Sequence, residues 1–72
     1  MVFGRDAACD VVLDGDEISR RHAAILLGPV GYTVTDESAN GTLVNDVPIG
    51  ERALEDGDRI TIGETVLEFR RA

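Results

Sequence analysis

The chain has 72 residues, with fourteen acidic against seven basic residues, a net charge of −7 and one cysteine. This length allows one domain, and a lone Cys9 excludes an internal disulfide. The acidic balance argues against a nucleic-acid-binding protein, which needs a basic face for phosphates. No apolar run approaches a membrane span, and the N-terminus lacks the apolar core of a signal peptide. We therefore expect a cytoplasmic protein with no nucleic acid or membrane partner.

Short apolar runs separated by turn residues follow one another along the whole chain. The longest run, Ala23 to Leu27, suits a buried strand at least as well as a helix. In chain order, the predicted strands are Val2–Phe3, Val11–Leu13, Ala23–Leu27, Tyr32–Val34, Thr42–Val44, Val47–Ile49, Arg59–Ile62 and Thr65–Arg70. Many short strands at close spacing predict an all-β fold, a small sandwich or barrel.

Turn signals separate these runs. Gly28–Pro29 ends the third run, and Asn45–Asp46 predicts a tight hairpin between two apolar runs. Asn40–Gly41 and Asp56–Gly57 are favoured turn pairs because their residues tolerate positive φ. In the last two strands the apolar residues alternate, so that Ile60 and Ile62 share one face.

Catalytic, cofactor and metal motifs find little support. The chain has no lysine for a P-loop and no Gly-x-Gly-x-x-Gly. The acidic stretch Asp14–Glu17 lacks the ligand spacing of an EF-hand and is typical of a solvated turn. Ser19 and His22 lie in no nucleophile elbow. We expect no enzymatic activity, no cofactor and no metal.

Three stretches differ from ordinary strand or turn sequences: Gly4–Arg5, Ser19–His22 and Ser38–Thr42. Each alone has a simple explanation, such as a solvated charge, a structural histidine or a hairpin turn. Together they place arginines, a hydroxyl and a side-chain amide in predicted loops, which a sandwich gathers at its ends. Arginine and hydroxyl donors suit a phosphate dianion, and an amide suits a peptide backbone. The combination indicates phosphopeptide binding.

At these residues the chain resembles the forkhead-associated (FHA) domains. The similar segments occur in order over nearly the whole chain: Gly4–Arg5, Cys9–Leu13, Ile18–Ala23, Tyr32–Asp36, Asn40–Asn45, Leu54–Gly63 and Leu67–Phe69. The resemblance implies an FHA/SMAD-like β-sandwich whose loops at one end bind phosphothreonine peptides, in signalling downstream of a Ser/Thr kinase.

The resemblance also implies roles for single residues. Arg5 and Ser19 would bind the phosphate, and Arg20 would add a basic contact. Asn40 would hold the main chain of the peptide. Structural support of the site would come from Gly4, His22, Gly41 and Thr42. Many family members have threonine or serine before the asparagine, where Ala39 cannot contact phosphate.

A second departure from the family is at the N-terminus. Family members usually have about two further strands before the Gly–Arg pair, so we expect residues 1–72 to form a single, N-terminally shortened FHA-like domain. The last strand, residues 65–70, would then be an open edge that could pair with a second copy. An alternative function is a structural or oligomerisation module whose FHA-like surface is phospho-independent.

Overall fold

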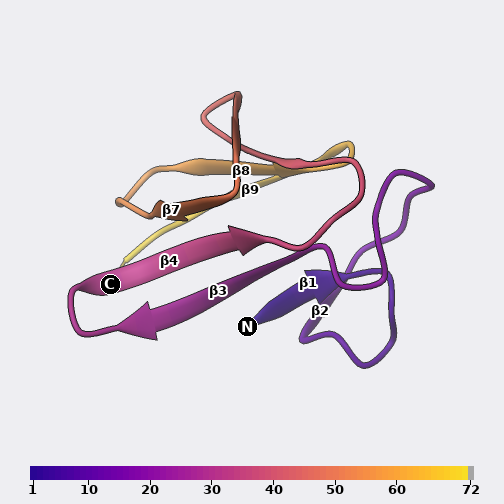
Figure 1. Cartoon of the computed structure of the whole chain (residues 1–72), viewed down its shortest axis with the longest axis horizontal. Coiled ribbons are helices and arrows are strands. Elements are labelled where there is room, and N and C mark those ends of the chain that lie inside the picture. The colour runs from indigo at the N-terminus through magenta and orange to yellow at the C-terminus, as the bar shows by residue number, and fades with distance from the viewer. Residues whose placement is uncertain (72) are drawn as a thin grey trace.

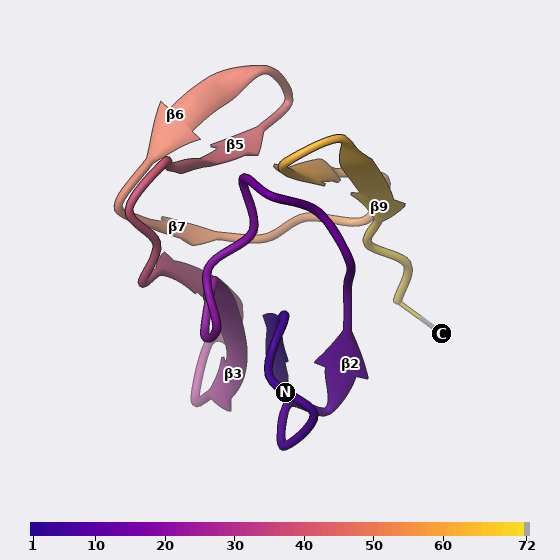
Figure 2. The ribbon, with the colours of Figure 1, turned by 90° about the vertical axis from the view of Figure 1, so that its right-hand side faces the viewer.

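The computed structural model describes residues 1–71; Ala72, the last residue of the predicted domain, lies outside the described residues. Residues 1–71 form nine strands and no helix, arranged as two facing sheets (Figures 1 and 2). The strands are β1 Val2–Gly4, β2 Val11–Val12, β3 Ala23–Gly28, β4 Gly31–Asp36, β5 Thr42–Val44, β6 Val47–Ile49, β7 Glu51–Ala53, β8 Arg59–Ile62 and β9 Thr65–Glu68. Within this part of the chain, no helix is long and apolar enough to cross a membrane.

The sheets have the strand orders β2-β1-β3-β4-β7 and β6-β5-β8-β9. All pairs are antiparallel except β1 and β2. The core lies between the sheets and contains Phe3, Ile18, Ala23, Val34, Val44, Leu54, Ile60 and Ile62. Each fully buried valine or isoleucine contributes roughly 1.5–3 kcal/mol. The predicted all-β sandwich is therefore confirmed.

All eight predicted strands are present, with small differences in their ends. The hairpin at Asn45–Asp46 is confirmed: both residues have positive φ, 52° and 67°, as a two-residue hairpin turn requires. The shared buried face of Ile60 and Ile62 is confirmed as well. The one additional strand, β7 (Glu51–Ala53), was not predicted, because it is mostly polar and pairs only as an edge strand with β4.

The register of the strands brings the functional loops to one end of the sandwich. Phe3 of β1 pairs with Ala23 of β3, which pairs with Asp36 of β4. In the second sheet, Thr42 at the start of β5 pairs with Ile62 at the end of β8. The loops that follow β1, β4 and β8 and the loop that precedes β3 therefore share the end of the molecule on the right of Figure 1. We call this the loop end.

Candidate functional site

The loop after β1 is joined to the loop before β3 by main-chain hydrogen bonds. Arg5 N donates to Ser19 O at 3.0 Å, and Asp6 N donates to Arg20 O at 3.2 Å. This contact depends on Gly4, because a Cβ at that position would lie 2.0 Å from the Arg20 carbonyl oxygen. A side chain at position 4 would thus separate the two loops.

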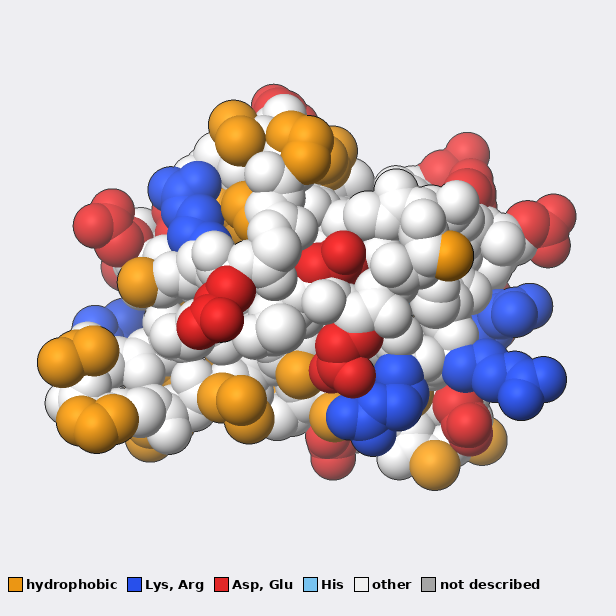
Figure 3. All heavy atoms as spheres, viewed as in Figure 1, with side chains coloured by type: hydrophobic (Ala, Val, Ile, Leu, Met, Phe, Trp, Pro, Cys, Tyr) orange, Lys and Arg blue, Asp and Glu red, His pale blue; other side chains and the backbone are white. Residues whose placement is uncertain are grey.

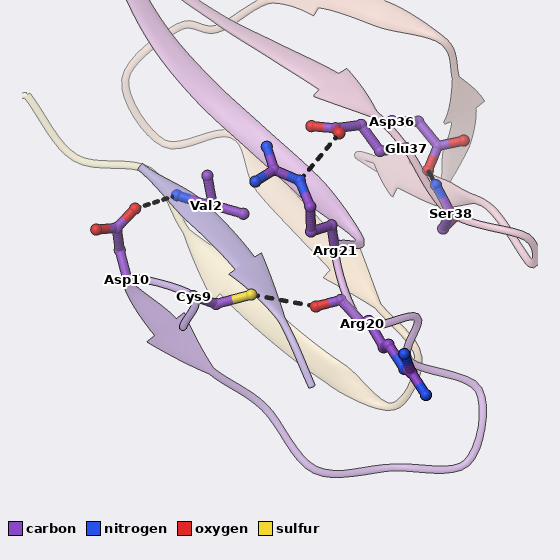
Figure 4. Close-up of polar contacts among 8 residues, drawn as sticks. All are labelled: Val2, Cys9, Asp10, Arg20, Arg21, Asp36, Glu37 and Ser38. Carbon is purple, nitrogen blue, oxygen red and sulfur yellow. Dashed lines mark hydrogen bonds and ion pairs between the residues drawn. The ribbon is translucent and has the colours of Figure 1, made fainter. Parts of the chain in front are cut away.

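Further hydrogen bonds from Cys9 and Asp10 hold the loop after β1 in place (Figure 4). The Cys9 thiol donates to the Arg20 carbonyl oxygen at 3.1 Å, and Val2 N donates to Asp10 Oδ2 at 2.7 Å. Asp6 Oδ1 accepts from Ala8 N at 2.9 Å, which closes a local turn. The backbone that carries Arg5 and Arg20 is therefore positioned by groups other than their guanidinium groups.

The side chains of Arg5 and Arg20 are exposed and line one open hollow of about 390 Å³ together with Asp6. Basic side chains gather at the loop end in the space-filling view (Figure 3). Within residues 1–71 the ion pairs are Arg21–Glu37 and Arg70–Glu68, so neither Arg5 nor Arg20 is engaged in one. Two guanidinium groups are thus available to an anion in this hollow.

Ser19 and Asn40 connect the loop before β3 to the loop after β4. Ala39 N donates to Ser19 Oγ at 3.1 Å, and Asn40 Nδ2 donates to Glu17 O at 3.2 Å. A hydroxyl that accepts one bond still has its own proton to donate. The Asn40 amide likewise keeps a second N–H, and its oxygen can accept. Both side chains are therefore bound to the protein and still able to bind a ligand.

His22 lies beneath these loops with 0% of its surface exposed. Ser19 N donates to its Nδ1 at 3.1 Å, and its Nε2 lies 2.8 Å from Gly41 O. The tautomer with its proton on Nε2 satisfies both contacts. His22 thereby joins the loop that carries Ser19 to the loop that carries Asn40.

Asp36, the last residue of β4, organises the loop after it. Its Oδ1 accepts from Ser38 Oγ at 2.6 Å and from the buried Thr42 Oγ1 at 2.7 Å. Ser38 Oγ in turn accepts from Gly41 N at 2.7 Å. Partial burial opposes ionisation of Asp36, but these bonds outweigh it and hold the pKa of its carboxyl below the ordinary value. Asp36 therefore fixes the segment that presents Asn40.

Asn40–Gly41 is not a hairpin turn, because it joins β4 of one sheet to β5 of the other. Gly41 has a φ of 101°, a conformation that residues with a Cβ rarely adopt. On either side of Gly41, Asn40 is exposed and Thr42 is buried.

The structure brings all eight predicted site residues to the loop end. Arg5, Arg20 and Asn40 are exposed and Ser19 is half-buried, whereas Gly4, His22 and Thr42 are buried and Gly41 has a positive φ. Sequence reasoning missed the contributions of Asp36 and Ser38. Their spacing, Asp-x-Ser after a strand, is a signal for a side-chain-closed turn that could have indicated them. Among residues 1–71, no group of three or more His, Cys, Asp or Glu side chains is placed to hold a metal ion.

Comparison with known proteins identifies this arrangement. The family model for the FHA domain matches residues 1–63. An oxoglutarate dehydrogenase inhibitor of Corynebacterium efficiens is 40% identical over 67 residues, which are 92% of this chain and 47% of that protein. The chain therefore spans about half the length of this relative.

Solved structures agree. A structure from a structural and functional analysis of phosphothreonine-dependent FHA domain interactions has a TM-score of 0.91 at 33% identity, covering 99% of this chain and 75% of that one. Mycobacterium tuberculosis EmbR in complex with a low-affinity phosphopeptide has a TM-score of 0.91 at 35% identity, covering 96% of this chain and 19% of EmbR.

Proposed function

This chain belongs to the family of FHA domains, and from that premise we propose that it is a phosphothreonine-dependent peptide-binding module in signalling downstream of a Ser/Thr kinase. One observation carries the proposal. Arg5 and Arg20 are exposed, lack ion pairs within residues 1–71 and line the same hollow. Paired guanidinium groups suit the dianion of a phosphorylated side chain.

In this proposal the phosphate lies in the hollow between Arg5 and Arg20. Arg5 binds it directly, Arg20 adds a second cation, and Ser19 donates its hydroxyl proton. The fixed positions of their backbones support these roles, because little ordering is needed when the ligand arrives. Asp6 lines the same hollow, and its Oδ1 is already engaged by Ala8 N.

Asn40 holds the main chain of the peptide beside the phosphothreonine. An amide suits this role because it supplies a donor and an acceptor, as an extended peptide backbone does. Its bond to Glu17 O fixes the rotation of the side chain before the peptide binds. The supporting residues are Gly4, His22, Gly41 and Thr42, which hold the loops in place.

The magnitudes are sufficient for a signalling interaction. A hydrogen bond to a charged group contributes roughly 1.5–3 kcal/mol, so three phosphate ligands supply several kcal/mol before ordering costs. A micromolar dissociation constant corresponds to about −8 kcal/mol. Phosphate binding together with the Asn40 contacts can reach this range.

The proposal treats residues 1–72 as one non-enzymatic domain in the cytoplasm. Support for a single unit comes from the continuous core between the two sheets. Support for a reducing compartment comes from Cys9, a half-buried thiol in a chain with no second cysteine. Family membership and the inhibitor relative support a binding role rather than catalysis.

Fluorescence anisotropy with paired threonine peptides tests the function. The phosphorylated and unphosphorylated forms of each peptide are titrated with the protein at the same ionic strength. We expect saturable binding of the phosphorylated form only. Equal binding of both forms would instead favour a phospho-independent interaction surface.

A second interaction has its own observation. β9 is an edge strand whose sole partner among the described residues is β8, and Val66 on it is 59% exposed. We propose that residues 65–70 can pair with the same strand of a second copy to form a homodimer. Sedimentation over a range of concentrations tests this, and a monomer at the highest concentration would contradict it.

A further inference from the structure

The edges of the two sheets differ in how well they are protected from a further strand. The edge strand β2 has two residues, β7 has three, and β6 has three with Pro48 at its centre. Short strands offer few hydrogen bonds, and a proline removes a donor. β9 has four residues, and pairing continues beyond it, because Phe69 N donates to Asp58 O at 2.8 Å. Within residues 1–71, β9 is therefore the longest and least protected edge.

The main-chain groups of β9 alternate between β8 and the open edge. In an antiparallel pair, every second residue directs its N–H and C=O toward the neighbouring strand. Phe69 does so, whereas Glu68 does not: its partner on β8 is Arg59, whose carbonyl accepts from Asn45 N instead. Glu68 and Arg70 therefore direct their main-chain groups to the open edge, where an added strand would pair with them.

An apolar hollow of about 310 Å³ lies beside this edge, between the two sheets. Its apolar lining consists of six side chains: Met1, Phe3, Ile25, Ile60, Leu67 and Phe69. Met1 stays 61% exposed there. A strand added to β9 would cover this hollow and remove apolar surface from water, which favours association.

The charges of the edge are complementary to a second copy of themselves. Glu68 and Arg70 are both exposed and form an ion pair within the chain. In an antiparallel pair of β9 strands with Phe69 opposite Phe69, each Glu68 lies opposite Arg70 of the other copy. Each carboxylate then lies between two arginines, Arg59 of its own chain and Arg70 of the second copy. Opposite charges placed directly across two strands stabilise their pairing.

Other antiparallel registers lack this match. A register centred on Glu68 would place the two Glu68 carboxylates opposite each other, which is unfavourable. One centred on Leu67 would place Glu68 opposite Val66. Registers shifted by half a residue would oppose a free main-chain edge to a bonded one, since the hydrogen-bonding direction alternates along the strand.

We propose that two copies of the chain pair through β9 in the antiparallel register centred on Phe69, with Glu68 of each copy facing Arg70 of the other. The inference rests on the homodimer proposed above and names its register and contacts. β9 begins near the loop end, where Thr65 pairs with Ile62, and runs toward the opposite end. Antiparallel pairing therefore directs the two loop ends away from each other, so that one dimer would bridge two phosphorylated partners.

Charge reversal at the edge tests the register. Glu68→Arg and Arg70→Glu each place two pairs of like charges across the interface. Sedimentation over a range of concentrations should show a dimer roughly three- to thirtyfold weaker for each variant. The double variant Glu68→Arg/Arg70→Glu restores both pairs in reverse and should restore the dimer. An equimolar mixture of the two single variants should also restore it, as a heterodimer.

Glu51→Arg is the matched control. Glu51 is exposed on β7, an edge strand of the other sheet, and its replacement changes the net charge as much as Glu68→Arg does. The chain carries a net charge of −7, so a less negative chain should by itself associate more readily. A weaker dimer in Glu68→Arg but not in Glu51→Arg therefore assigns the effect to the edge. Circular dichroism verifies that each variant is folded, as expected when an exposed ion pair is lost.

The outcomes separate the register from the homodimer and from peptide binding. A wild-type monomer at the highest concentration would overturn the inference together with the homodimer. A dimer that neither single variant weakens would overturn the register alone. Weakening by Arg70→Glu but not by Glu68→Arg would also overturn it. Phosphopeptide affinity, measured by anisotropy, should be the same in all these variants, so the proposed peptide-binding function stands or falls separately.

Discussion

The two ends of the sandwich are each organised around an aspartate, and β5 connects them. Thr42, the first residue of β5, donates to Asp36 at the loop end. Asn45, just beyond the last residue of β5, donates to Asp58 at the opposite end, at 3.0 Å. Asp58 also accepts from Glu55 N at 2.8 Å, and these two bonds keep its pKa below the ordinary value despite burial.

The ends differ in how their arginines are placed. At the far end Arg70 pairs with Glu68, and Arg71 lies 5.7 Å from the centre of the Tyr32 ring. At the loop end neither Arg5 nor Arg20 forms an ion pair within residues 1–71. At both ends, a hydrogen-bonded aspartate fixes the segment that adjoins the strands. Arg59 at the far end is also exposed and in neither ion pair, so the distinguishing feature of the loop end is that Arg5 and Arg20 line the same hollow.

Replacing His22 should have the largest effect on stability. His22→Ala leaves Ser19 N and Gly41 O without their buried partner and opens a cavity, so we expect a loss of about 2–5 kcal/mol in the free energy of unfolding. Urea denaturation followed by circular dichroism measures it. At the far end, Asn45→Ala should cost about 1–2 kcal/mol and leave phosphopeptide affinity unchanged. A His22→Ala variant as stable as wild type would contradict the structural role of the histidine.

Replacing Arg5 should have the largest effect on binding. Arg5→Ala removes a charged ligand of the phosphate and should weaken phosphopeptide binding about ten- to a hundredfold. Its circular dichroism spectrum and midpoint of unfolding should stay those of the wild type, since only the Arg5 main chain bonds the neighbouring loop. Arg59→Ala, an exposed arginine at the far end, is the charge-matched control. Unchanged affinity in Arg5→Ala would refute the assignment.

Low pH should lower the free energy of unfolding through both aspartates, Asp36 at the loop end and Asp58 at the far end. Because the pKa values of Asp36 and Asp58 are lowered by folding, the unfolded chain takes up protons first. The stabilisation is complete above about pH 4 and is lost as the pH falls through the lowered values. Asp36→Asn and Asp58→Asn should each reduce the slope of stability against pH below pH 4, by up to about 1.4 kcal/mol per pH unit.

The same two variants, assayed for phosphopeptide affinity at neutral pH, show which end of the sandwich supports binding. Asp36→Asn should also weaken phosphopeptide binding, because Asp36 holds the segment with Asn40. Asp58→Asn should not. Equal losses of affinity in the two variants would show that the far end supports the site as well.

The smallest effect is expected at Ala39, which is exposed beside Ser19 and donates its N–H to the Ser19 hydroxyl. Ala39→Ser adds a hydroxyl near the proposed phosphate position, and one further hydrogen bond should tighten binding about threefold or more. Anisotropy with the phosphorylated peptide checks this. Ala39→Val is the control of similar size without a hydroxyl, and an equal gain there would point to packing instead.

Most of the fold follows from the sequence because apolar alternation and turn residues mark each half-buried strand. Glu51–Ala53 escaped prediction because its strand conformation depends on its pairing with Thr33–Thr35 of β4 and not on its own residues. Asn40–Gly41 has the composition of a hairpin turn. Only the partition of β4 and β5 between two sheets shows that it is a crossing.

The ligand roles of Arg5, Ser19, Arg20 and Asn40 stay predictions. Of the residues that position their loops, the sequence indicated Gly4, His22, Gly41 and Thr42 but not Asp36 and Ser38. The side chains of arginine, serine and asparagine carry the hydrogen-bonding groups that suit a phosphate and a peptide main chain, so their residue types alone indicate this chemistry. Asp36 and Ser38 act on the loop backbone, and their importance depends on bonds that close only in the folded chain. Glu17 was predicted as part of a solvated turn. Its relation to Asn40 depends on contact between two loops 23 residues apart.

Ile18 fixes the loop before β3 to the core of the sandwich. It is 2% exposed and belongs to the core, while Glu17 beside it is at the surface and Ser19 is half-buried. Ile18 therefore anchors the loop in the core, while Glu17 and Arg20 are exposed. Substitutions at these two exposed positions should therefore change the charge of the loop surface while the buried Ile18 keeps its place in the core.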